Sequence, residues 1–343
     1  MRVLITGGAG FIGCNAAVEF MRRGDEVLVF DNLSRVGTDR NLEWVRSCGD
    51  VRFIRGDVRD ADAVRDAICG VDDLDVVLHL AAQVAVTTSV VEPRDDFEIN
   101  ALGTFNVLEA VRAARSDPLV LFSSTNKVYG GLEDVECRLE GSRWVCDLSS
   151  RGVDERRGLD FHSPYGCSKG AADQYVRDYA RIYGMRTVVL RQSCIYGNRQ
   201  FGVEDQGWLA WFTLAACMGR QITIYGDGRQ VRDVLEVSDL VRLYRLCIEN
   251  PDRVAGRIMN VGGGPDNAIS IGESLELMGE LLGIEIPVAH ADWRPGDQKI
   301  FVSCNELAGE LVGWRPGVDV RTGMSRLVEW IRPNLDMIRA LVE

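Results

Sequence analysis

Short apolar runs rich in valine, isoleucine and leucine alternate with helical patterns through the first half of the chain. Such runs are typical of parallel strands buried on both faces, and the intervening segments fit right-handed helical crossovers. The predicted strands are Arg2–Thr6, Glu26–Phe30, Val51–Arg55, Val76–Leu80, Leu119–Ser123 and Val188–Arg191, and the predicted helices are Asn15–Arg23, Phe97–Ala114 and Ser168–Tyr183. The alternation predicts an α/β fold with a doubly wound parallel sheet of the Rossmann type.

Two parts of the chain depart from this alternation. Residues 130–159 are rich in Gly, Arg, Asp and Glu, which predicts an insertion loop before a helix beginning near Ser163. Beyond Arg191 loops become frequent, with amphipathic segments at Ile271–Leu282 and Arg321–Ile331. We expect a larger domain over residues 1–190 and a smaller C-terminal substrate-binding lobe over residues 191–343. Residues 222–246 are expected to return partly to the first domain.

Composition and charge exclude several classes of protein. The 343 residues carry a net charge of −12, which argues against a general nucleic-acid or membrane surface. The ten cysteines form no CxxC pair or Cys/His cluster, and the three histidines are dispersed. We therefore expect no metal site and no disulfide framework. Without an apolar leader or a long apolar run, the expected location is the cytoplasm.

A glycine-rich turn follows the first predicted strand. Gly7, Gly10 and Gly13 stand where the chain turns sharply, approaches a pyrophosphate and packs a helix on the sheet, and each task needs a residue without Cβ. Asp31 closes the second strand, where a carboxylate accepts hydrogen bonds from an adenosine ribose. Its charge would repel a 2′-phosphate, which favours NAD over NADP. Arg35, a residue type that can hold such a phosphate, leaves that choice open.

Two further strand ends extend the nucleotide-binding pattern. Asp57 and Val58 follow the third strand as a candidate adenine-contacting pair, with a helix N-cap as the alternative role of Asp57. The small residues after His79, including Ala81, would let a cofactor lie against the backbone of the fourth strand. Together these features predict one nucleotide-binding half of a doubly wound sheet.

The candidate catalytic residues are Tyr165, Lys169 and Thr125. The first two are spaced i, i+4, which places both side chains on one helix face. A phenol is a poor base near neutrality, and a neighbouring ammonium would favour its phenolate form. Thr125 ends the fifth strand, where ligands of such sheets bind, and its hydroxyl could share the proton with Tyr165. Tyr165 and Lys169 could instead be a half-buried tyrosine beside a surface lysine, and Thr125 could only provide a turn hydroxyl. The dinucleotide-binding motif earlier in the chain favours the catalytic roles.

These motifs together resemble the extended short-chain dehydrogenase/reductase family of NAD-dependent epimerases and dehydratases. The resemblance runs from Met1 to about Ile331 and rests on TGGAGFIG, Asp31, SST…VYG and YxxxK. Stretches 30–44, 83–89, 123–130, 159–175, 199–208 and 226–235 are most similar to a branch that epimerises C2 of CDP-linked 3,6-dideoxyhexoses. The resemblance implies tightly bound NAD, a nucleotide-sugar substrate that is CDP-linked, and a homo-oligomer.

The resemblance also implies individual binding residues. Those expected around NAD, with the glycines included, are Gly7, Gly10, Phe11, Ile12, Gly13, Asp31, Asn32, Ser34, Arg35, Asp57, Val58, Leu80, Ala81, Gln83, Asn100, Ser123, Tyr165, Lys169 and Gln192. Those expected around the substrate are Gln83, Thr125, Asn126, Arg199, Arg232 and Arg294, with Lys299 as a weaker candidate. The Arg232 guanidinium suits a diphosphate, and a salt bridge to Asp233 or Asp239 is its alternative role.

The departures from the family pattern bear on the reaction. Asn126 and Lys127 stand where 4,6-dehydratases of the family commonly carry Asp-Glu, and neither can act as an accepting carboxylate. Cys194 stands where relatives often have Asn. Dehydration is therefore disfavoured. The resemblance alone implies that the reaction is epimerisation at C2 through a transient 2-keto sugar, converting CDP-paratose to CDP-tyvelose. The alternatives are a 4-epimerase of a UDP- or other NDP-hexose, and a catalytically silent NAD sensor. The aromatic run 208–212 is expected to form an apolar wall for the sugar, or to pack the lobe.

Overall fold

A seven-stranded parallel sheet forms the centre of the protein, in a computed structural model that describes residues 1–146, 150–204, 206–293 and 298–342. The strand order is β12-β8-β5-β4-β1-β2-β3. The strands are β1 (Arg2–Thr6), β2 (Glu26–Asp31), β3 (Val51–Arg55), β4 (Val76–His79), β5 (Leu119–Thr125), β8 (Thr187–Gln192) and β12 (Ile258–Val261). This arrangement confirms the predicted doubly wound α/β fold. The strand order reverses between β1 and β4, where such sheets bind their ligands.

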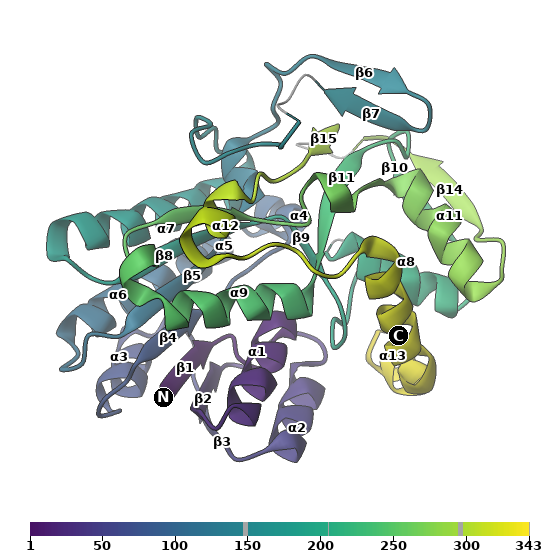
Figure 1. Ribbon diagram of the computed structural model, residues 1–343. Helices are drawn as coiled ribbons and strands as arrows, with labels where there is room; N and C mark the ends of the chain where they lie inside the picture. Colours follow the sequence, from purple (N-terminus) through teal and green to yellow (C-terminus); the bar gives the residue numbers. More distant parts are fainter. Residues whose placement is uncertain (147–149, 205, 294–297, 343) are drawn as a thin grey trace.

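Helices cover both faces of this sheet (Figure 1). In β1, Val3 and Ile5 belong to one core cluster and Leu4 to the other, because successive side chains of a strand point to opposite faces. The helices of the first cluster are α1 (Phe11–Arg22), α2 (Thr38–Cys48), α9 (Val237–Glu249) and α12 (Glu306–Val312); those of the second are α3 (Ala61–Cys69), α6 (Gly103–Ala113) and α7 (Ser163–Tyr183). The continuous apolar runs of the sequence are thus explained by burial on two sides.

Helix boundaries differ from the sequence-based expectation, most clearly in α1 and in the predicted helix Phe97–Ala114. Helix α1 begins at Phe11 rather than Asn15, because the glycine turn leads directly into it. The expected helix Phe97–Ala114 divides into α5 (Pro93–Phe97), a π-helical turn over Glu98–Leu102, and α6. The spacing of apolar residues cannot distinguish such a wide turn from regular α-helix, because both keep one face towards the core.

The chain returns to the sheet after it has left for the C-terminal lobe. Strand β12, which was not predicted, pairs with β8 at the sheet edge, and helix α9 packs in the first core cluster. By contrast β10 (Ile222–Tyr225) pairs with β14 (Val288–Ala291). Residues 222–246 were expected to return partly to the first domain. The part that does so belongs to α9, which packs against one face of the sheet. The division near residue 190 stays a prediction.

The C-terminal lobe lies to one side of the sheet in Figure 1. Its further strands are β9 (Cys194–Tyr196), β11 (Val231–Glu236), β13 (Ala268–Ser270) and β15 (Ile300–Phe301), and its helices are α8 (Trp208–Cys217), α11 (Ile271–Leu282) and α13 (Val320–Val342). Leu209, Met278 and Leu327 from these three helices share one buried cluster. The remaining short elements are α4 (Val86–Val91), α10 (Pro251–Val254) and the 3₁₀ turns Asn126–Tyr129 and Pro265–Asn267. No helix in the described ranges is long and apolar enough to cross a membrane.

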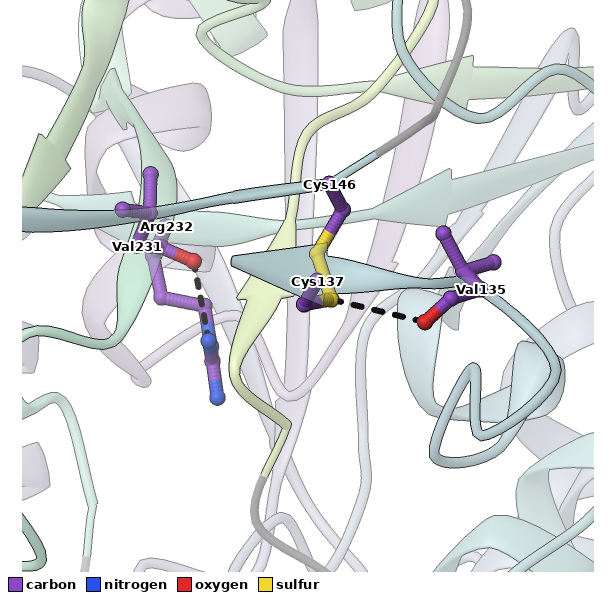
Figure 2. The surroundings of a disulfide bond; sticks show 5 residues. All are labelled: Val135, Cys137, Cys146, Val231 and Arg232. Carbon is purple, nitrogen blue, oxygen red and sulfur yellow. Dashed lines mark hydrogen bonds between the residues drawn. A yellow bond between two sulfur atoms is a disulfide. The ribbon is translucent and has the colours of Figure 1, made fainter. Parts of the chain in front are cut away.

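The insertion at residues 130–159 contains an antiparallel hairpin of β6 (Cys137–Glu140) and β7 (Arg143–Cys146). Cys137 lies opposite Cys146 in its register, and the two form a disulfide bond (Figure 2). The expectation that the cysteines form no disulfide was wrong, because their pairing depends on strand register and not on a spacing motif. Disulfides are rare in reducing compartments. The cytoplasmic location therefore stays a prediction.

Candidate active site

A cavity of about 740 Å³ lies where the carboxyl ends of the sheet strands meet the C-terminal lobe. Its wall includes the turn after β1, the ends of β2, β4 and β5, the first turns of α7, and parts of α8, β10 and β11. The predicted site residues that line it are Gly7, Gly10, Phe11, Ile12, Gly13, Asp31, Asn32, Ser34, Arg35, Asp57, Val58, Leu80, Ala81, Ser123, Thr125, Asn126, Tyr165, Lys169, Gln192, Arg199 and Arg232. The fold thus gathers most of the predicted residues, which are far apart in sequence, around one space.

The glycine turn leaves room for a ligand where a side chain would intrude. Gly7 has a φ of +68°, and a Cβ there would lie 2.7 Å from the backbone nitrogen of Ala81. A Cβ on Gly13 would lie 2.6 Å from the Cα of Gly8, within the turn itself. Gly10 is the N-cap of α1 and has no side chain to cap the helix. The first N–H groups of this helix therefore face the cavity side of the turn without a side-chain cap, an arrangement that suits the pyrophosphate of a dinucleotide.

The acidic groups beyond this turn are held by backbone and side-chain donors. The Asp31 carboxylate accepts hydrogen bonds from the N–H groups of Ala9 at 3.0 Å and Leu33 at 2.8 Å, although burial raises its pKa. Asp57 accepts from the Asn32 amide at 2.9 Å, and its hydrogen bonds with Arg59 lower its pKa to about 2. Asp57 is thus charged at neutral pH beside the region expected to hold adenine and its ribose.

Tyr165 and Lys169 lie on the same face of α7, as the i, i+4 spacing predicts, and both side chains are buried at the cavity wall. Burial raises the pKa of Tyr165 to about 12. Two influences act in the opposite direction: a hydrogen bond with the side chain of Thr125 and the positive charge of Arg35. The proton of the Tyr165 phenol is therefore held next to Thr125, in a position from which it can be shared.

The lysine has a different environment from the one expected. Its Nζ donates to the backbone carbonyl of Ser123 at 2.6 Å and lies 4.4 Å from the centre of the Phe122 ring. Burial lowers the pKa of Lys169 to about 7, against the charges of Asp173 and Asp96. The lysine is thus fixed at the end of β5, and its ammonium form is weakened by desolvation.

Thr125 stands at the junction of β5 and the following turn. Its hydroxyl oxygen accepts a hydrogen bond from the N–H of Lys127 at 3.2 Å, and the hydroxyl donates to Asn126 Oδ1 at a long 3.4 Å. The backbone contact fixes the oxygen, while the hydroxyl proton can turn between neighbours. Thr125 therefore combines the predicted turn role with a position beside Tyr165.

Gln83 and Asn100 stand apart from the residues that line the cavity. The Gln83 N–H donates to Asn100 Oδ1, and the Asn100 amide donates back to the Gln83 carbonyl, each at 3.0 Å. Asn100 also donates to Asp96 at 3.1 Å and to Ser168 at 3.1 Å, the residue before Lys169. This geometry gives both residues a supporting position behind the cavity wall, and their predicted contacts with ligand stay predictions.

The substrate-side arginines differ in how they are held. Arg232 is 8% exposed and donates to the Val231 carbonyl at 2.8 Å. Its alternative partners are engaged elsewhere: Asp233 accepts from the N–H groups of Ser303 and Gly264, and Asp239 pairs with Arg242. The Arg199 guanidinium lies 4.3 Å from the centre of a Trp44 ring. Arg294 lies outside the described residues.

The lobe contributes wall residues that sequence reasoning identified only in part. Trp208, Leu209 and Phe212 from the predicted aromatic run line the cavity, as does Cys194. Gln230 was missed, although strand alternation from Arg232 could have indicated it. Other residues that were not predicted to line the cavity include Thr38, Asn41, Val86, Thr87, Val90, Gln200, Phe201, Glu204, Thr223 and Tyr225. Most are on loops or short helices, where the side-chain period of a strand or a long helix cannot be used to predict which side chains face the cavity.

The sequence model of the NAD dependent epimerase/dehydratase family matches residues 3–262. The chain belongs to this family. Membership confirms the expectation of an enzyme that depends on NAD, and the glycine turn and the buried Tyr165–Lys169 pair fit that cofactor.

Individual members show how far the likeness extends. The chain is 43% identical to the CDP-paratose 2-epimerase of Salmonella typhi over 335 residues, which covers 96% of this chain and 99% of the relative. It matches the structure of Thermus thermophilus UDP-glucose 4-epimerase in complex with NAD, with a TM-score of 0.80, 33% identity, and coverage of 97% of this chain and 99% of that one. The UDP-glucose 4-epimerase of Thermotoga maritima with UDP-glucose gives a TM-score of 0.82, 30% identity, and coverage of 98% and 100%. The chain is therefore similar to nucleotide-sugar epimerases along its whole length.

Proposed function

We propose that this enzyme epimerises C2 of a CDP-3,6-dideoxyhexose and converts CDP-paratose to CDP-tyvelose through a transient 2-keto sugar. The observation that carries the proposal is the position of the Tyr165 phenol and the Thr125 hydroxyl at one wall of the cavity, next to Asn126 and Lys127. The 43% identity to a CDP-paratose 2-epimerase supports the choice of carbon and nucleotide. Tyr165 and Thr125 can move a proton, whereas neither neighbour offers a carboxylate for elimination.

NAD, when it is bound in this cavity, supplies the acceptor and then the donor of a hydride. Tyr165 in its phenolate form, which the positive nicotinamide ring of bound NAD would favour, takes the proton of the C2 hydroxyl, and Thr125 donates a hydrogen bond to the same sugar oxygen. The Nζ of Lys169 donates a hydrogen bond to the Ser123 carbonyl, which holds the lysine at the same wall of the cavity as Tyr165. After the 2-keto sugar has turned to present its other face, Tyr165 returns the proton. The net redox change is zero, so the reaction needs no external oxidant.

The diphosphate holds the substrate while the sugar turns. Arg232, almost fully buried, offers a planar guanidinium that can contact two phosphate oxygens at once. The apolar side chains of Trp208, Leu209 and Phe212 make few directional contacts, so they tolerate both ring faces of a deoxygenated sugar. This combination supports an anchored nucleotide with a mobile sugar.

Substrate labelled with deuterium tests the proposal. Purified enzyme should convert CDP-paratose to CDP-tyvelose without a net change in the oxidation state of bound NAD. Deuterium at C2 should slow turnover, whereas deuterium at C4 should not. Inactivity on all CDP-sugars would contradict the proposal.

A 4-epimerase acting on a UDP- or other NDP-hexose is the second candidate. The likeness to two UDP-glucose 4-epimerases of known structure favours it. In that case an isotope effect appears with deuterium at C4. The alternative of a catalytically silent NAD sensor does not fit, because the chain belongs to a family of NAD-dependent enzymes and has both Tyr165 and Lys169 at the cavity.

We further propose a homo-oligomer that buries an apolar surface on α5 and α7. Phe97 is 56% exposed, Tyr175 50% and Ile182 66%. Phe105 of α6 packs edge-on against Tyr175 and continues this surface between the helices. Size-exclusion chromatography with light scattering should give a multimer for the native chain and a smaller species for Ile182→Asp.

A further inference from the structure

Strand β11 leads away from the catalytic end of the cavity. Its Val234 pairs with Cys194 of β9, which lies two residues beyond Gln192. Gln192 in turn lies opposite Thr125 in the register of β8 with β5. The carboxyl half of β11 is therefore close to the catalytic threonine, and its beginning lies further out in the lobe.

Alternate residues along this strand line the cavity. Val234, Arg232 and Gln230, the residue just before β11, all belong to the wall, because residues two apart in an extended chain share a face. At about 3.3 Å per residue, Gln230 lies about 13 Å along the chain from Val234. With the sugar at Thr125 and the diphosphate at Arg232, the nucleoside falls beside Gln230.

Gln230 brings an unsatisfied acceptor to this outer end. The residue is 1% exposed, and its Nε2 donates to the backbone carbonyl of Tyr225 at 2.5 Å. That contact fixes which end of the amide is which, since a carbonyl can only accept. Its Oε1 has no hydrogen-bond partner within the part of the chain that the structure describes. A buried acceptor without a hydrogen-bond partner destabilises the protein, and a hydrogen-bond donor on a bound ligand would remove this penalty.

A second acceptor stands at the same end of the cavity. The Tyr225 hydroxyl donates to the Glu204 carboxylate at 2.8 Å, and both residues line the cavity. An ionised carboxylate can only accept hydrogen bonds. Tyr225 therefore links two accepting groups, Glu204 through its hydroxyl and Gln230 through its carbonyl.

We propose that Glu204 and Gln230 select a nucleoside whose base carries an amino group, cytidine, over one that carries a carbonyl there, uridine. The amino group at C4 of cytosine donates hydrogen bonds, whereas uracil presents an accepting oxygen at C4. Two acceptors favour the amine and repel the carbonyl oxygen. The inference rests on the proposed function, because it takes the diphosphate to lie at Arg232.

Calorimetric titration of the NAD-loaded enzyme with CDP and with UDP tests the inference without any sugar chemistry. The native enzyme should bind CDP about tenfold more tightly than UDP, the size of one hydrogen bond to a charged or buried group. Glu204→Gln and Gln230→Leu should each reduce this ratio to about threefold or less. Glu285→Gln, which removes an exposed carboxylate away from the cavity, should leave the ratio unchanged.

Equal affinity of the native enzyme for the two nucleotides overturns the inference, and so does a ratio that survives both substitutions. Glu204 is exposed, so Glu204→Gln tests the inference even if Gln230→Leu fails to fold. The outcome is separate from that of the proposed reaction. A preference for CDP without C2 epimerisation supports the nucleoside selection alone, whereas C2 epimerisation without that preference overturns the selection alone.

Discussion

Asp173 and Arg191 form a buried ion pair, with Arg191 Nη2 2.9 Å from Asp173 Oδ1 and a second contact of 2.9 Å from Nε to Oδ2. The Ser124 hydroxyl also donates to Asp173 at 2.7 Å. Asp173 belongs to α7, which carries Tyr165, and Ser124 precedes Thr125 in β5. The ion pair therefore joins the helix of the proposed base to β8, and the Ser124 hydrogen bond joins the same helix to β5, the strand of its hydroxyl partner.

Asp173→Asn should destabilise the protein by about 3–5 kcal/mol, because it leaves the Arg191 guanidinium buried without a counter-charge. Turnover should also fall, since α7 loses its ion pair with β8, the strand that pairs with β5. Urea unfolding measures the first effect and steady-state kinetics the second. Asp178→Asn changes an exposed carboxylate of the same helix and should alter neither. Equal stability of the two variants would contradict the structural role of the pair.

Tyr165→Phe should lower kcat by about 100-fold or more while NAD binding and folding are retained. The substitution removes only the hydroxyl that is proposed to move the substrate proton. Nuclear magnetic resonance of the interconverting nucleotide sugars measures the rate. Tyr175→Phe, at an exposed position of the same helix, is the matched control and should keep native activity. If Tyr165→Phe turned over like the control, another group would have to be the base.

The stability of the protein should depend on pH through Lys169. Burial lowers the pKa of this lysine from its usual 10.5 to about 7, so between these values the unfolded chain binds more protons than the folded one. The free energy of unfolding then rises with pH in this window. The variant Lys169→Met has no ionisable side chain at this position and therefore lacks this rise in the free energy of unfolding. The native chain should gain about 2 kcal/mol relative to the variant between about pH 7 and 9, measured by urea unfolding. Parallel pH profiles would show that Lys169 is not desolvated.

Gly13→Ala should weaken NAD binding and lower stability by about 1–3 kcal/mol. The added methyl group would collide with the backbone of Gly8 and with the carbonyl oxygen of Gly7, and backbone cannot move aside without opening the turn. Thermal unfolding and NAD titration measure the two effects. A methyl group on Gly158 would meet nothing within 4 Å, so Gly158→Ala serves as the control and should behave like the native chain.

A thiol count tests the hairpin disulfide. The structure leaves eight of the ten cysteines free and pairs Cys137 with Cys146. Protein denatured without a reductant should therefore titrate as eight thiols, and reduced protein as ten. The double variant Cys137→Ser/Cys146→Ser should give eight in both conditions. Ten thiols in the native protein without a reductant would show that the bond does not form under those conditions.

The sheet and the glycine turn could be predicted because local rules decide them. The run after Met1 is apolar at successive positions, which requires burial on two faces, and Gly7 and Gly13 occupy places where any Cβ meets backbone. The spacing of Tyr165 and Lys169 is likewise a property of one helix. Strand β12 escaped prediction because a run of four residues, three of them apolar, fits a strand or a buried helix equally well.

The amino-acid sequence alone determined the fold class, the nucleotide-binding turn and the candidate catalytic set, because each depends on residues that are neighbours along the chain or repeat with a helix or strand period. The tertiary structure decided what those residues meet. Packing turned Lys169 towards Ser123, placed Gln83 and Asn100 behind the cavity wall, and brought Cys137 opposite Cys146. Burial, register and desolvation arise only when distant segments come together, so no local pattern encodes them.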